Sequence, residues 1–267
     1  MRRNVRIAAR AFAALLLAAA SIDVPAAAKD IPSVAARKRN ELTSFTDGQI
    51  ADGFMKTAFG AEYHLAGRVD RIRKYHGPVR VFAIGGPARR RAQLATVVAD
   101  IGRHVRHLDI AMAASAGAAN VTVNLVRNRN FDRAIARAYG RRRAREIRTM
   151  LDPQCLSGFR KNERLEIQHS DIFLTTDNGD FIFHDCAYEE LLQSLGPISD
   201  TDEIPWTMFN DSVQMGYFDI YDQYILNILY DPRIKAGMTV DDVRRLLPEV
   251  LKDVRPWVRE VNGLPGE

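Results

Sequence analysis

Two glutamates and a glutamine in one helical segment have a spacing that could build a zinc-dependent hydrolytic site. The segment runs from Cys186 to Gly196 and places Glu189 and Gln193 four residues apart, with Glu190 after the first of them. Histidines at this spacing lie on one helix face and bind one zinc ion, while the glutamate after the first histidine acts as general base. Here both histidine places are exchanged. Glu190 remains as the candidate catalytic base, and a glutamine, a poor zinc ligand, replaces one anchor.

Residues beyond this segment would complete such a site. Ser199 or Asp200 stands where a third metal ligand would follow, and Met208 lies in a turn further along the chain. The six histidines are scattered, and His184 is the one that could join Glu189 and Asp200 in an alternative ligand set. We therefore predict no metal and no cofactor, and zinc is the ion to test. The candidate cleft consists of Glu189, Gln193, Asp200 and Met208.

The helix that carries these residues is predicted to be amphipathic. At 100° per residue, Leu191 and Leu195 fall on one side, and Glu189, Glu190 and Gln193 fall on the other. We expect the apolar side to pack on a sheet and the polar side to face outward. A glycine followed by proline, at 196 and 197, should end the helix. A solvated polar face is the usual explanation for such residues, so it competes with an active site.

The elements that must position this helix can be predicted from periodicity and turn residues. Helices are expected over 45–59, opened by Thr46-Asp47, over 93–105, from 131 onward in an arginine-rich stretch, and over 218–230. Strands are expected over 79–84, which ends at a Gly85-Gly86-Pro87 turn, and over 121–126. Segments 167–175 and 180–183 should form a hairpin around Asp177-Asn178-Gly179 that runs directly into the helix from Cys186.

The first 28 residues are predicted to be a signal peptide. Four arginines stand among the first ten residues, an apolar run covers 11–20, and small residues follow up to Ala28. The apolar run is about half of the roughly 20 residues that a membrane helix needs. An uncleaved anchor is the alternative. We expect a periplasmic or secreted protein that begins at Lys29 and has no membrane span in its mature chain.

Export determines how the two cysteines are interpreted. In an oxidising compartment Cys155 and Cys186 are expected to form a disulfide. Closing a loop of about 30 residues contributes roughly 3 to 4 kcal/mol in the chain-entropy model. The bond would fix the start of the helix that carries Glu189 and Glu190. A free buried thiol and a metal ligand are the alternatives, although thiolate ligands to zinc usually come in closely spaced pairs.

Charge is distributed unevenly along the chain. Residues 29–150 carry 24 basic and 10 acidic side chains, a net +14, whereas residues 151–267 carry 10 basic and 22 acidic ones, a net −12. The densest basic cluster lies between Arg133 and Arg148. A solvated helix face that complements the acidic half is one interpretation, and contact with anionic envelope polymers or lipid head groups is the other. No nucleic-acid-binding motif is recognisable, so no nucleic-acid partner is expected.

Three motifs carry a resemblance to known families. Cys155-Leu-Ser-Gly-Phe159, the Cys-x-x-Glu-Glu-Leu-x-Gln-x-Leu-Gly segment from 186 to 196, and Leu229-Tyr-Asp-Pro-Arg233 resemble a proteobacterial family of exported proteins catalogued as a domain of unknown function, over residues 46–254. The order of helix, glycine turn, methionine turn and C-terminal helix ending in Leu-Tyr also resembles metzincins, with the histidine ligands replaced. The resemblance implies a compartment and a zincin-like layout rather than an activity.

The predicted fold class is therefore α+β, with a zincin-like mixed sheet packed by helices and a helical C-terminal part. With no repeat or dividing linker, a single domain is expected over 45–260, between a polar lead-in at 29–44 and a tail at 261–267.

Three functions follow from these predictions. We expect a non-catalytic metallopeptidase-like domain that binds a peptide or an envelope partner in the former substrate cleft. The alternative is a metal-dependent hydrolase in which Glu190 activates water on a metal held by an atypical carboxylate set. A third function is a purely structural envelope protein whose arginine-rich helix contacts an anionic surface. The sequence does not predict the oligomeric state.

Overall fold

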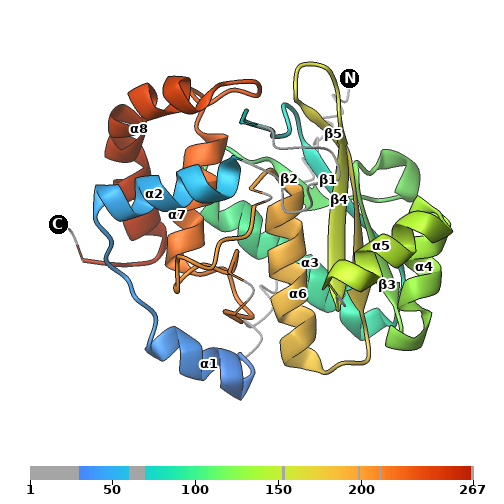
Figure 1. The fold of residues 1–267 in the computed structure, drawn as a ribbon. Coiled ribbons are helices and arrows are strands. Elements are labelled where there is room, and N and C mark those ends of the chain that lie inside the picture. Colours follow the sequence, from blue (N-terminus) through green and yellow to red (C-terminus); the bar gives the residue numbers. More distant parts are fainter. Residues whose placement is uncertain (1–29, 60–69, 152–153, 198, 211, 266–267) are drawn as a thin grey trace, which may run out of the picture. The chain divides into compact units, whose positions relative to one another are not determined.

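A five-stranded mixed sheet organises the protein in a computed structural model, which describes residues 30–59, 70–151, 154–197, 199–210 and 212–265 (Figure 1). The predicted signal peptide therefore lies outside the described residues. The strands are β1 (Val79–Gly85), β2 (Ile110–Met112), β3 (Val121–Val126), β4 (Cys155–Lys161) and β5 (Ile167–Thr175). Their order is β2-β1-β3-β5-β4, and every neighbouring pair is parallel except β4 with β5. The mixed sheet predicted from the sequence is confirmed, and β4 lies at one edge of it.

Helices cover both faces of the sheet (Figure 1). On one face lie α3 (Ala88–His104) and α6 (Asp180–Ser194), and α6 packs on β4 and β5. On the other face lie α4 (Phe131–Tyr139) and α5 (Arg141–Leu151), which form a small core of their own with Leu156 and Phe173. Alternate residues of a strand point to opposite faces, so β5 contributes Ile172 and Leu174 to the large core and Phe173 to the small one.

A helical layer completes the large core beside α6. It contains α2 (Asp47–Ala58), α7 (Ile220–Tyr230) and α8 (Val240–Val261), and α7 contacts both of the others. The predicted start of α2 is confirmed, because Thr46 and Gln49 form a capping box there, and the side chain of Asp219 caps α7. Short 3₁₀ turns lie at Ala116–Ala118 and Asn128–Asn130. The polar lead-in contains one further helix, α1 (Pro32–Arg39).

The predicted hairpin around Asp177-Asn178-Gly179 is wrong. Residues 180–183 are the first turn of α6, so the turn joins a strand to a helix, and the true hairpin is β4 with β5. The reason is a contact between segments that are distant in the sequence. The buried guanidinium of Arg90 on α3 donates to the carbonyl oxygens of Thr176 and Gly179 and to Asp180 Oδ1, which fixes the turn against α3. Asp180 also places a negative charge in the first turn of α6, where the helix dipole favours it.

The arginine-rich stretch forms two helices rather than one. Gly140 lies between α4 and α5 with a φ of +85°, a conformation that interrupts a helix and that glycine adopts readily. Most of its arginines are exposed, including Arg133, Arg137, Arg141, Arg142 and Arg145. Within the described residues, no helix is long and apolar enough to cross a membrane.

Candidate functional site

Helix α6 is buried on both of its sides. The predicted apolar side packs as expected, with Leu191 and Leu195 fully buried. The expectation that the polar side faces outward is wrong, because Glu190 is 5% exposed and Gln193 is 3% exposed, while Glu189 is half-buried. A helix between a sheet and further chain can bury both sides, and here the edge strand β4 and the segment after Gly196 cover the polar one.

Gln193 forms hydrogen bonds with two polar side chains outside α6. Gln193 donates from Nε2 to Asp200 Oδ1 at 3.0 Å, and its Oε1 accepts from Ser157 Oγ of β4 at 3.4 Å. The structure therefore brings together Gln193 and Asp200 of the predicted set. The amide uses both its donor and its acceptor within the protein, which is the arrangement that a buried polar side chain needs.

Glu190 is buried on α6, one helical turn after Cys186, whose disulfide joins the helix to β4. Its charge acts on Tyr139 at the end of α4: burial first, and then the negative charges of Asp171 and Glu190, raise the pKa of the Tyr139 hydroxyl above its ordinary value. A carboxylate in such a place can accept a proton or a hydrogen bond, so its chemistry is compatible with the role of a base and equally with a structural role.

Met208 lies in a turn that contacts the first turn of α7. Its backbone N–H donates to Asp222 Oδ2 of α7 at 2.8 Å, and the hydroxyl of the neighbouring Thr207 donates to Asp222 Oδ1 at 2.5 Å. The methionine side chain is 4% exposed and belongs to the large core. The methionine turn is therefore held by α7, and the carbonyl of Phe209 in the same turn accepts from the backbone N–H of Thr201, the residue after Asp200.

Asp219 and Asp222 form a buried acidic pair at the start of α7. Asp222 is fully buried and accepts two hydrogen bonds from the methionine turn, so its negative charge is the better stabilised of the two. Asp219 is 2% exposed and accepts one, from the backbone N–H of Asp222. Burial, and then the negative charge of Asp222, raise the pKa of Asp219 well above its ordinary value. The folded protein therefore retains a proton on Asp219 that the unfolded chain releases.

Replacing Asp219 by asparagine is expected to stabilise the protein at neutral pH by at least about 1 kcal/mol. The raised pKa means that the native stability is complete below the ordinary value of 3.8 and declines as pH rises towards the folded pKa. Asparagine keeps the helix cap and cannot ionise, so the part of the decline that Asp219 causes should disappear, whereas the part caused by Asp185, whose pKa is also raised, should remain. Urea unfolding between pH 4 and pH 8 measures it. Asp241→Asn, at an exposed site in the first turn of α8, is the control and should leave the decline intact.

Ser199, a predicted ligand, has a structural partner, because its Oγ donates to the carbonyl of Phe59. On α6, Asp185 Oδ1 accepts from the backbone N–H groups of Met215 and Gly216. Burial raises the pKa of Asp185 to about 6 although these two hydrogen bonds oppose the shift. Across the part of the chain that the structure describes, no cluster of three or more histidine, cysteine, aspartate or glutamate side chains is arranged to hold a metal ion.

The predicted disulfide between Cys155 and Cys186 is present, with the two Cα atoms 5.8 Å apart. It joins the first residue of β4 to the middle of α6, and it leaves neither sulfur as a thiolate ligand or nucleophile. The bond places the edge strand directly beside the helix face that carries Glu190 and Gln193.

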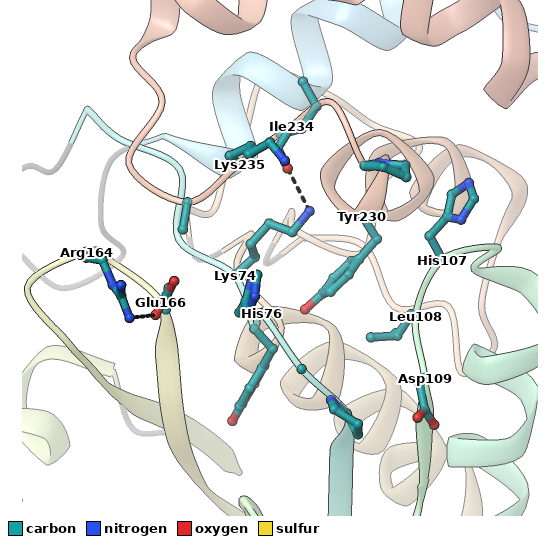
Figure 2. A pocket seen from close by; sticks show the side chains of 15 residues that line it. Lys74, His76, His107, Leu108, Asp109, Arg164, Glu166, Tyr230, Ile234 and Lys235 are labelled. Carbon is teal, nitrogen blue, oxygen red and sulfur yellow. Dashed lines mark hydrogen bonds and ion pairs between the residues drawn. The ribbon is translucent and has the colours of Figure 1, made fainter.

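A cavity at the amino ends of β1 and β5 has no signal in the sequence. Lys74 lies in it and donates from Nζ to the carbonyl oxygens of Leu229 and Ile234, at 2.6 and 2.8 Å (Figure 2). Arg233 forms a two-pronged ion pair with Asp231 just after α7. The Leu-Tyr-Asp-Pro-Arg motif is therefore the C-terminal cap of α7. A lysine bound to a motif over 150 residues away in the sequence has no local signal.

Comparison with known proteins places the chain in a family. Residues 47–249 match the family described as "Protein of unknown function (DUF2927)". The chain belongs to this family. The match with DUF2927 extends from α2 into α8 and includes β4, α6, the methionine turn and the Lys74 cavity. Searches of the curated proteins and of the solved structures found no match.

Proposed function

We propose that this DUF2927 chain is an exported, non-catalytic binding domain with a zincin-like layout, and that it holds an extended peptide segment of an envelope partner along β4. The observation that carries the proposal is the position of β4. It pairs with β5 on one side, and within the described residues no strand pairs with its other side. An edge strand offers a row of backbone N–H and C=O groups, and peptides bind such edges by adding a strand.

The surroundings of β4 support a peptide rather than another sheet. Ser157, Gly158 and Phe159 are half-buried, so the strand offers both polar and apolar surface, and Arg160 and Lys161 are exposed at its end. Terminal charges of this kind discourage edge-to-edge association of sheets. The disulfide anchors the other end of β4 to α6.

The polar contacts of α6 support binding without hydrolysis. For Glu190 to act as a base on zinc-bound water, position 193 must supply a metal ligand. Gln193 instead forms hydrogen bonds with Asp200 and Ser157. An oxidised disulfide within the domain is in keeping with an exported protein, because such bonds persist in oxidising compartments.

Amide hydrogen exchange with a mixed library of unstructured decapeptides tests the proposal. With the chain from Lys29 to Glu267, we expect the library to slow exchange in β4 by roughly tenfold, because ladder hydrogen bonds protect amides. Strand β2 is the internal control, since it forms the opposite edge of the same sheet and should not change. Equal slowing in both edge strands, or none in β4, would contradict the proposal.

The same incubation separates binding from hydrolysis. Mass spectrometry of the library should find intact peptides, and elemental analysis of protein purified without chelator should find no stoichiometric transition metal. Peptide cleavage that disappears in the Glu190→Gln variant would instead establish the hydrolase, with Glu190 as its base.

A further inference from the structure

The Lys74 cavity lies at the end of the sheet where β1 and β5 begin, away from the predicted cleft. Its volume is about 650 Å³, within the range of small-molecule sites. Four segments that are distant in sequence line it: 74–78 before β1, 107–109 before β2, the β4–β5 turn at 164–166, and the segment 230–236 after α7. Figure 2 shows their side chains around the same space.

The acidic groups of this cavity already have partners. Glu166 Oε2 accepts from Asn162 Nδ2 at 2.7 Å and pairs with Arg164 at 3.4 Å, and the Asn162 hydrogen bond lowers the pKa of Glu166. Asp109 forms a two-pronged pair with Arg80, at 2.8 and 3.0 Å. Both carboxylates are thus neutralised by groups of the protein itself, and neither attracts a cation from solution.

The basic groups at the rim are less directly paired, although the carboxylates of Glu166 and Asp231 interact electrostatically with His76, His107 and Lys74. Lys235, His76 and His107 line the cavity at exposed positions, and within the described residues none of them forms an ion pair. They come from three of the four lining segments, so they can contact a small ligand in the cavity from different sides (Figure 2). Lys235 therefore contributes a positive charge at the rim, and the two imidazoles contribute ring nitrogens that can form hydrogen bonds.

Lys74 adds a cation inside the cavity. Its ammonium has three protons, of which two are donated to the carbonyl oxygens of Leu229 and Ile234, and it lies 5.0 Å from the centre of the Tyr230 ring. These contacts hold the amine in place, and the two carbonyl oxygens account for two of its three N–H groups. Burial lowers the pKa of Lys74 to about 8, which an anion beside it would raise again.

The turn that brings Arg164 and Glu166 to the cavity is strained. Leu165 between them has a φ of +66°, a left-handed conformation that costs a residue other than glycine of order 1 kcal/mol or more. Such strain in a leucine is uncommon, and it occurs at functional sites more often than elsewhere. Here it coincides with the lip of the cavity.

We propose that this cavity binds a small oxyanion ligand, a molecule with a phosphate or carboxylate group. The anion lies between Lys74 and the rim formed by Lys235, His107 and Arg164, and the ring of Tyr230 and the side chain of Ile234 contact its apolar part. This site is independent of peptide binding at β4, because none of the residues that line it belongs to β4 or α6.

NMR titration of the mature chain with inorganic phosphate, and separately with succinate, tests the site. We expect saturable shifts of the amide signals of residues 107–109 and 234–236 below about 10 mM ligand in low salt. The anion with the lower dissociation constant identifies the preferred chemistry. Absence of saturation with both anions would overturn the proposal.

Charge reversal provides the matched variants. Lys235→Glu should weaken binding roughly tenfold or more, because it replaces an attraction at the rim by a repulsion. Lys252→Glu makes the same change at an exposed position of α8 that does not line the cavity, and should leave the dissociation constant unchanged. Equal weakening in both variants would mean that anions respond only to net charge, which would also overturn the site.

Discussion

Replacing Gly196 by alanine is expected to lower the free energy of unfolding by about 3 kcal/mol or more. A Cβ atom at this position would lie 2.3 Å from the carbonyl oxygen of Arg73 and 2.9 Å from Leu229 Cδ2. The φ of +139° adds conformational strain for any residue with a side chain. The obstacle is a backbone atom, so rotation of a side chain cannot relieve it.

Two other glycines separate the steric cost from the conformational cost. Gly179 has a φ of +94° and open space around its Cβ position, so Gly179→Ala should cost only the strain, about 1 to 2 kcal/mol. Gly117 has open space and an ordinary φ, so Gly117→Ala should be nearly neutral. Urea unfolding of the three variants gives the order. A Gly196→Ala variant no less stable than Gly179→Ala would show that the contact with Arg73 relaxes without cost.

This glycine illustrates why a motif can be recognised without revealing a function. The spacing from Gln193 to Gly196 has the form of a metal-site turn, and packing alone requires a glycine there. The same holds for Arg233, whose pairing with Asp231 ends α7. Both positions are explained by close contacts between segments, so their presence is evidence for the fold and not for catalysis.

Elements with strong local signals could be predicted from the sequence. The alternation of Val121, Val123 and Leu125 specifies β3, and the Thr46 capping box specifies the start of α2, because both depend on neighbouring residues alone. The start of α6 depends on Arg90, more than 80 residues earlier, so the same turn residues indicated a hairpin. Local patterns do not contain such contacts.

The burial of Glu190 and Gln193 could not be predicted from periodicity either. A hydrophobic stripe identifies one packed side of a helix, but it does not reveal what covers the other side. Here the covering groups include Ser157 of β4 and Asp200 of an irregular segment. The Lys74 cavity was missed for a related reason, since four separate segments form it and none carries a recognisable ligand motif.

The disulfide is where the sequence prediction, the fold and the proposed peptide site meet. The Cys155→Ala/Cys186→Ala double variant is expected to lose roughly 3 to 4 kcal/mol of unfolding free energy, because the bond closes a loop with a sequence separation of 31 residues. Alanine avoids placing a buried hydroxyl beside α6. The loss should be visible as a lower midpoint of urea unfolding, with a steeper slope because the unfolded chain without the cross-link exposes more surface.

The loss should also be local, because β4 is an edge strand with one neighbour and the disulfide is its covalent link to α6. Amide exchange in β4 should accelerate in the double variant more than in β2, at the other edge. A thiol reductant should reproduce both effects in the natural chain and change nothing in the double variant. If β4 stays protected while global stability falls, the bond acts only on the unfolded chain, and β4 presents its edge to a peptide without the support of the disulfide.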